Sequence, residues 1–248
     1  MKDILFEGEG LTKEQKVEFL MDMAHRLIFH HVFWFKEVEH QFGFERALEV
    51  LTEVLNQARM VHSRRIEKEL GIPFKQGLPE HLLEMDEEGL LRIMETIAKM
   101  WIANDGMWFL SVEKLRDMND AKRCNDSCWC WFSPFEAYSI KRVLGLSEYG
   151  GLSALKKALK FRVYAFLNIQ EIREPDENVL EFYMKECRVQ VARKRKGLPD
   201  YPCKSAGLVE YARFAQYIDP RIQTECIGCP PDEHPEEWFC AWRFTLKD

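Results

Sequence analysis

The sequence lacks any apolar run of about 18 residues, the length that a membrane-spanning helix requires. Its first 30 residues contain no basic segment followed by an apolar one, and we therefore expect no secretory signal. These two absences favour a cytoplasmic protein that does not enter a membrane. In that compartment, the eight cysteines are expected to be metal ligands or buried thiols and not disulfides.

Basic residues are also too few for a nucleic-acid-binding protein, because the net charge of the 248-residue chain is −6. The single basic run, at positions 193–196, is interpreted as the solvated end of a helix. No serine–histidine–acid or cysteine–histidine set is recognisable. The expected partner is therefore a small molecule, and the 46% of hydrophobic residues is ample for a folded core.

An internal repeat organises the first part of the chain. Residues 16–72 match residues 90–146 without a gap, and ten positions are identical, among them Trp34 and Trp108. Such a long ungapped match indicates a duplicated unit. The sequence therefore predicts a helical domain over residues 1–150 that contains two copies of one motif.

Each copy has the pattern of an αα-hairpin. Apolar residues recur three and four positions apart up to Gly43, where the first helix should end. A second helix is expected from Glu45 to Leu70, followed by a linker over 73–79. In the second copy, Asn119 is the expected N-cap of the corresponding helix. Trp34 and Trp108 are predicted to be equivalent core residues.

Three cysteines in the second copy could be mistaken for a metal motif. Cys124 and Cys128 align with Val50 and Val54 of the first copy, which are apolar. Because a free cysteine behaves as a small apolar residue, we predict that Cys124 and Cys128 pack in the core. We exclude both, together with Cys130, from the metal site.

The remaining residues, 151–248, change in pattern and predict a compact α+β domain with a four-stranded sheet. Alternating apolar residues indicate strands, and clusters of turn residues separate them. The expected order is two strands, two helices and two strands: strands at 161–170 and 180–184, helices at 188–196 and 208–217, and strands at 222–226 and 238–245.

Five cysteines of this second domain form the candidate metal site: Cys187, Cys203, Cys226, Cys229 and Cys240. The pair Cys226-x2-Cys229 can chelate one ion from a tight turn, and Gly228 allows the backbone to bend there. Four thiolates favour zinc, or alternatively an iron–sulfur cluster. Reduced thiols, or a redox pair at Cys226 and Cys229, remain open as alternatives, and Cys240 could instead pack in the core.

Several of these segments resemble a known group of proteins. The stretches 187–197, 202–204, 226–232 and 240–244 are similar to an uncharacterised family of prokaryotic cytosolic proteins allied to the L-2-amino-thiazoline-4-carboxylic acid hydrolases. A more distant similarity is to hydrocarbon-binding domains of the 4-vinyl reductase type. The latter resemblance implies a zinc-binding, cysteine-rich C-terminus.

Two functions follow as hypotheses. In the first, a structural metal stabilises the cysteine-rich domain, and a small molecule binds between this domain and the helical one, near Trp34 and Trp108. In the second, a metal with an open coordination position hydrolyses a small cyclic C–N or C–S compound. In either case, Arg188, Gln190 and Arg193 are the candidates for binding a carboxylate of the ligand.

Overall fold

The computed structural model describes residues 10–197 and 199–247, and its fold is α+β, as the sequence predicted. The expectation of no secretory signal therefore falls partly outside the described residues. The chain divides into two compact units, one up to Glu84 and one from Met85 onward.

The first unit is an αα-hairpin with a small appendage. It contains α1 (Lys13–Phe42) and α2 (Phe44–Leu70), followed by the two-residue strands β1 (Phe74–Lys75) and β2 (Leu78–Pro79) and the short helix α3 (Glu80–Leu83). Thr12 begins α1 with a capping box, in which its side chain and that of Gln15 each bond the other's backbone. Gly43, at φ 86°, separates the two helices. The expected linker is thus a short β-hairpin.

The second repeat copies the first closely. It consists of α4 (Glu87–Leu115) and α5 (Met118–Leu144), and both bounds of α5 lie 74 residues after those of α2. Gly71 and Gly145 end the equivalent helices in the left-handed conformation. The N-cap of α5 is Asp117 and not Asn119, because the Asp117 side chain accepts a hydrogen bond from the Asp120 backbone N at 2.8 Å.

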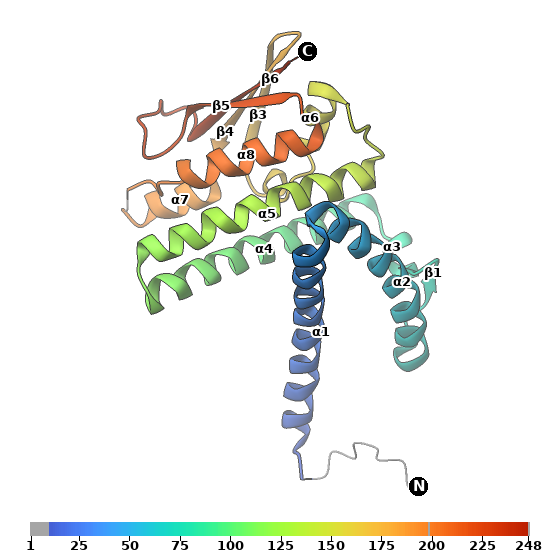
Figure 1. Ribbon diagram of the computed structural model, residues 1–248. Coiled ribbons are helices and arrows are strands. Elements are labelled where there is room, and N and C mark those ends of the chain that lie inside the picture. Colours follow the sequence, from blue (N-terminus) through green and yellow to red (C-terminus); the bar gives the residue numbers. More distant parts are fainter. Residues whose placement is uncertain (1–9, 198, 248) are drawn as a thin grey trace. The chain divides into compact units, whose positions relative to one another are not determined.

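Beyond α4 and α5, the second unit contains α6 (Gly151–Leu159), the 3-10 helix η1 (Val163–Phe166), β3 (Ile169–Asp176), β4 (Val179–Glu186), α7 (Arg188–Arg195), α8 (Lys204–Ile218), β5 (Ile222–Gly228) and β6 (Cys240–Leu246). These elements are built in layers (Figure 1). A four-stranded antiparallel sheet, in the order β3-β4-β6-β5, packs on α8, α8 on α5, and α5 on α4. The apolar core lies between the sheet, α8, α5 and α6, with Phe182, Phe214 and Trp242 fully buried.

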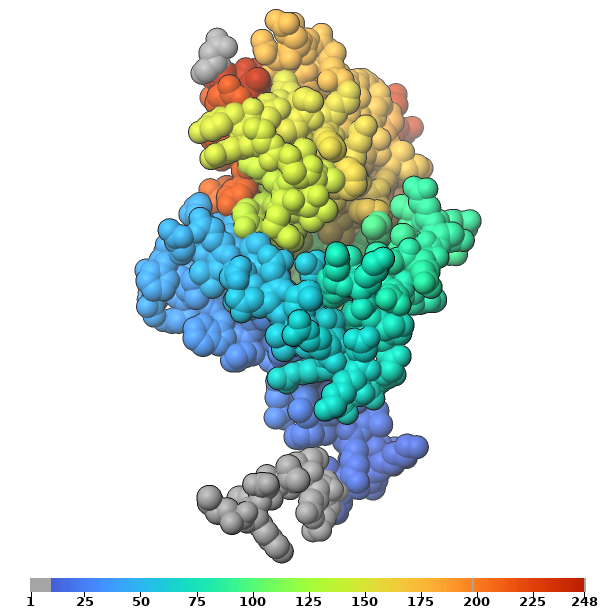
Figure 2. Space-filling view, turned by 90° about the vertical axis from the view of Figure 1, so that its right-hand side faces the viewer, coloured from blue at the N-terminus to red at the C-terminus, as the bar shows by residue number. Residues whose placement is uncertain are grey.

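Helix α6 closes one side of this core. Leu152, Leu155 and Leu159 are buried on its inner face, and the helix contacts β4 and β6. An ion pair between Lys156 and Glu174 joins it to β3. Figure 2 shows this side of the unit, with the segment around α6 in yellow beside the β3–β4 hairpin in light orange.

The prediction of a strand over residues 161–170 is wrong. Its first part contains η1 instead, and the sheet begins at Ile169, which pairs with Glu186. The reason is a buried charge: Arg162, which the alternation placed on a solvent-facing side, is only 2% exposed and forms an ion pair with Glu136. The same carboxylate accepts a hydrogen bond from the Val163 backbone N at 2.8 Å, which fixes the turn.

The compact units also divide the chain at Glu84/Met85 and not near residue 150. Helix α5, which the sequence assigned to a separate helical domain, packs along α8 of the cysteine-rich region. The second hairpin and the cysteine-rich segment therefore share one core.

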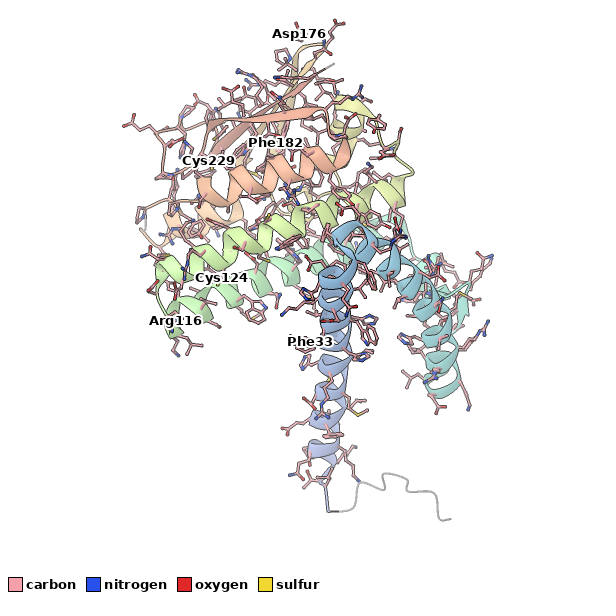
Figure 3. The ribbon with its side chains drawn as sticks, in the orientation of Figure 1. Phe33, Arg116, Cys124, Asp176, Phe182 and Cys229 are labelled. Carbon is pink, nitrogen blue, oxygen red and sulfur yellow. The ribbon has the colours of Figure 1, made fainter. Side chains whose placement is uncertain are left out.

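Two predictions of buried residues are wrong. Trp34 and Trp108 are each 61% exposed, and Cys124 and Cys128 are exposed on α5. The repeat aligned these positions correctly, but the aligned face is a surface face. Helix α1 shows this most plainly, since it has no buried residue, and Figure 3 shows Phe33 on it. None of the described helices combines the length and apolar character needed to cross a membrane.

Candidate thiol cluster and adjoining cavities

The five candidate cysteines lie at or next to four elements of the second unit: α7, α8, β5 and β6. Cys187 and Cys203 are the residues before α7 and α8, Cys226 lies on β5, Cys229 follows β5, and Cys240 begins β6. Figure 3 places Cys229 at the end of the sheet where β5 ends and β6 begins. Cys203 and Cys240 each influence the pKa of Cys187, Cys226 and Cys229. The thiols thus lie near enough to interact electrostatically, and a shared metal site remains a prediction.

Cys203 and Cys229 form a close pair, with their Sγ atoms 3.5 Å apart. The hydrogen bond between them lowers the pKa of Cys203 and raises that of Cys229, because it stabilises one thiolate next to one thiol. The Gln190 side-chain amide also donates to Cys203 Sγ at 3.6 Å. By contrast, burial raises the pKa of Cys187 to about 12. Among the four candidate thiols whose pKa is shifted, only Cys203 has its pKa lowered.

The expected Cys226/Cys229 chelate is not the closest pair. Cys226 lies opposite Trp242 in the sheet, and a register shift separates it from Gly228. The Cys229 thiol instead forms hydrogen bonds with the thiols of Cys203 and Cys240. Within the described residues, no group of three or more histidine, cysteine, aspartate or glutamate side chains is gathered closely enough to hold a metal ion.

Four of the five thiols, all except Cys226, border a cavity of about 690 Å³ inside the second unit. The cavity extends from α4 and α5 on one side to α7, α8 and the sheet on the other. Aromatic and aliphatic side chains supply most of its wall: Ile102, Phe109, Leu110, Trp129, Tyr164, Leu167, Met184, Tyr201, Tyr211, Phe239 and Trp242. Polar groups enter it at a few points, as is typical of ligand sites.

The predicted carboxylate-binding residues of α7 all border this cavity, but they differ in role. Gln190 is 1% exposed, and its amide bonds both the N and the O of Tyr201, at 2.8 and 2.9 Å. It therefore holds the loop before α8. Arg193 donates to Pro199 O at 2.7 Å, at the same loop. Arg188 is exposed beside the cavity.

The two predicted tryptophans do not border this cavity. Trp34 belongs to the first unit, where its Nε1 donates to His30 at 3.1 Å. Trp108 borders a second, smaller cavity of about 340 Å³ between α4 and α5. The two cavities adjoin, because Asp105, Phe109, Asn125 and Trp129 border both.

A buried charge network next to the larger cavity has no recognisable signal in the sequence. Arg162 lies 2.8 Å from a carboxylate oxygen of Glu136 and 2.8 Å from one of Glu210. Although burial alone disfavours its charge, these two carboxylates raise the pKa of Arg162. Glu210, which borders the cavity, has its pKa raised to about 7, chiefly by burial and against the effect of Arg162. The second buried carboxylate, Glu136, adds to this rise, because one arginine cannot neutralise both.

Comparison with known proteins identifies a family but no activity. The chain belongs to a family of unknown function (DUF6125), whose model matches residues 9–85 and 81–246. The two matched segments meet at the boundary between the compact units. Neither the curated proteins nor the solved structures contain a match to the chain.

Proposed function

We propose that this protein binds a small, largely apolar molecule in the larger cavity of the second unit. The observation that carries the proposal is the wall of that cavity: about 690 Å³ bordered mainly by aromatic and aliphatic side chains, with few polar groups. Pockets of this size and composition are the usual sites of small-molecule ligands. The ligand would lie between the second helical repeat and the cysteine-rich segment.

The polar end of the ligand would be a carboxylate. Arg188 and Arg193 stand on the first two turns of α7 beside the cavity, and arginine binds carboxylates with two parallel hydrogen bonds. Gln190, between them, is occupied by the Tyr201 backbone and would act by holding that loop in place. Such a ligand would have its carboxylate at α7 and its apolar body against Trp129 and Tyr211.

Decanoate is a suitable probe, with 1-decanol as its neutral counterpart. We expect millimolar decanoate to raise the melting temperature, since a ligand that binds only the folded state stabilises it. The rise should shrink in Arg188→Gln and Arg193→Gln. It should persist in Arg195→Gln, a change on the same helix at a residue that does not border the cavity. The absence of any rise, or equal rises in all three variants, would contradict the proposal.

The thiols are proposed to hold a structural zinc ion, or alternatively an iron–sulfur cluster. In a tetrahedral zinc site with Zn–S bonds of about 2.3 Å, sulfurs stand about 3.8 Å apart, and the Cys203 and Cys229 sulfurs are 3.5 Å apart. This pair fits two of the four positions, and two of Cys187, Cys226 and Cys240 would have to move closer to complete the set. The ion would crosslink the starts of α7 and α8 to the sheet.

Elemental analysis of anaerobically purified protein tests the metal. We expect about one zinc ion per chain, lost in Cys229→Ser and retained in Cys124→Ser, a matched change at an exposed cysteine. X-ray absorption should show only sulfur neighbours if the ion is structural. A metal-free wild-type protein would overturn this part of the proposal and leave the cavity proposal standing.

A second candidate, hydrolysis of a small cyclic C–N or C–S compound, is favoured by Glu210. A carboxyl group whose pKa is about 7 at the wall of an apolar cavity can accept or donate a proton at neutral pH. The test is turnover of 2-amino-thiazoline-4-carboxylate, with Glu210→Gln expected to abolish it. If the wild-type protein shows no turnover, the binding function would be the only one left.

A further inference from the structure

The smaller cavity has an unusual combination of walls. Trp101, Trp108, Trp129 and Phe132 supply aromatic surface, and Asp105 supplies a carboxylate. The rings are held by mutual packing: the Trp101 centroid lies 5.6 Å from that of Trp129 and 5.2 Å from that of Phe132. Trp108, which is mostly exposed, forms the outer wall. The cavity is thus an aromatic recess that opens to solvent.

Its charge is one-sided. Among the described residues that border it, Asp105 alone carries a formal charge, and none is basic. Burial raises the pKa of Asp105, and the described residues show no ion pair that would oppose this effect. The nearby Arg162, 5.9 Å from the Trp129 ring centroid, is already paired with Glu136 and Glu210. The recess therefore has a negative group and no fixed cation to match it.

The duplicated hairpin provides an internal comparison. At the positions equivalent to Trp101, Asp105, Trp129 and Phe132, the first copy has Leu27, His31, Leu55 and Ala58. Both copies nevertheless form helices with closely matching bounds. The three aromatic rings and the carboxylate are therefore not required to build the hairpin, and they are confined to the copy that has the recess.

From these observations we infer that the smaller cavity is a binding site for an organic cation, such as an alkylated ammonium group. Aromatic faces attract a cation that lies within about 6 Å of a ring centroid, and Asp105 would supply the counter-charge. The site adjoins the larger cavity, with which it shares Asp105 and Trp129, but it takes a ligand of opposite charge, and its proposal does not depend on the carboxylate site.

Choline is the probe, and 3,3-dimethylbutan-1-ol, in which carbon replaces the charged nitrogen, is its neutral counterpart. Tryptophan fluorescence should change on titration with choline, because three of the seven tryptophans border the recess. We expect the neutral compound to bind at least about tenfold more weakly than choline, since it lacks the attraction to the rings and to Asp105.

Variants locate the site. Asp105→Asn should weaken choline binding by about tenfold or more. Glu95→Gln, which changes an acid of the same helix that pairs with Lys99 and borders neither cavity, should have no effect. Trp108→Ala should weaken binding several-fold without loss of the fold, because that side chain is mostly exposed. Saturating choline should also protect Cys128, in the wall of the recess, from alkylation.

The inference is overturned if millimolar choline leaves both the fluorescence and the alkylation of Cys128 unchanged. It is equally overturned if the neutral compound binds as well as choline, or if Asp105→Asn retains full affinity. In the last two cases the recess would be an apolar pocket without selectivity for a cation.

Discussion

Glu210→Gln should change the pH dependence of stability in a defined direction. In the folded protein, the pKa of Glu210 is about 7, against an ordinary value of 4.5. Between these two pH values the folded state retains a proton that the unfolded chain has released. The wild-type protein therefore loses stability as the pH rises from 4.5 to 7, whereas a glutamine, which does not titrate, does not.

The magnitude follows from the shift. From 4.5 to about 7, at about 1.4 kcal/mol per pKa unit, the full change amounts to about 3.5 kcal/mol, of which about 3 kcal/mol falls between pH 4.5 and pH 8. Glu210 is only 6% exposed, so solvent screens it little. We expect the free energy of unfolding of Glu210→Gln, measured relative to wild type, to be about 3 kcal/mol higher at pH 8 than at pH 4.5.

Urea unfolding followed by circular dichroism at both pH values measures this difference. Glu225→Gln, at an exposed partner of Arg243, is the control for the loss of one glutamate charge. A Glu210→Gln difference that is constant with pH would show that Glu210 stays ionised beside Arg162. Glu210 would then not exchange a proton with a ligand near neutral pH.

Three further changes test the surroundings of the cavity. Arg162→Met should destabilise the protein by about 3–5 kcal/mol in thermal melts, since it leaves two buried carboxylates without their cation. Asp219→Ala should cost about 3 kcal/mol near neutral pH, because buried Asp219 accepts hydrogen bonds from Arg221 and from the Gly151 backbone N. That cost should vanish as the pH falls from about 4 to 2, since Arg221 lowers the pKa of Asp219 to about 2. Gln190→Leu should release the Tyr201 loop and speed alkylation of Cys203 roughly tenfold, as measured by peptide mass spectrometry.

Local signals in the sequence were sufficient for much of the fold. Glycines in the left-handed conformation end the long helices where expected, and the helix periodicity located both hairpins. The 74-residue repeat holds in the structure to within a residue. These features depend on neighbours in the chain, and a single sequence contains them.

Long-range packing was harder to read. The repeat showed that Trp34 and Trp108 are equivalent, but not whether their shared face is buried, because that depends on which element covers it. Arg162 looked like a solvent-facing strand residue, since its partners Glu136 and Glu210 lie 26 and 48 positions away. Three carboxylate or guanidinium side chains so distant in sequence leave no local pattern.

The candidate site had weak local signals for the same reason. Cysteine spacing favoured Cys226 as the partner of Cys229, whereas in the structure the Cys229 thiol forms a hydrogen bond with that of Cys203. A register shift separates Cys226 from Gly228 in β5, and no residue type in the sequence indicates it. The role of Gln190 in holding a loop likewise became visible only through its backbone partners.

The central claim is that the larger cavity of the second unit binds a carboxylate-bearing apolar ligand. A crystal structure with 10-bromodecanoate tests it most directly, because the anomalous signal of bromine locates the far end of the ligand. We predict a bromine peak inside the cavity, near Trp129 and Tyr211, with the carboxylate at Arg188 or Arg193. A bound ligand whose bromine and carboxylate both lie outside the cavity, or crystals at millimolar ligand with the cavity free of it, would contradict the claim.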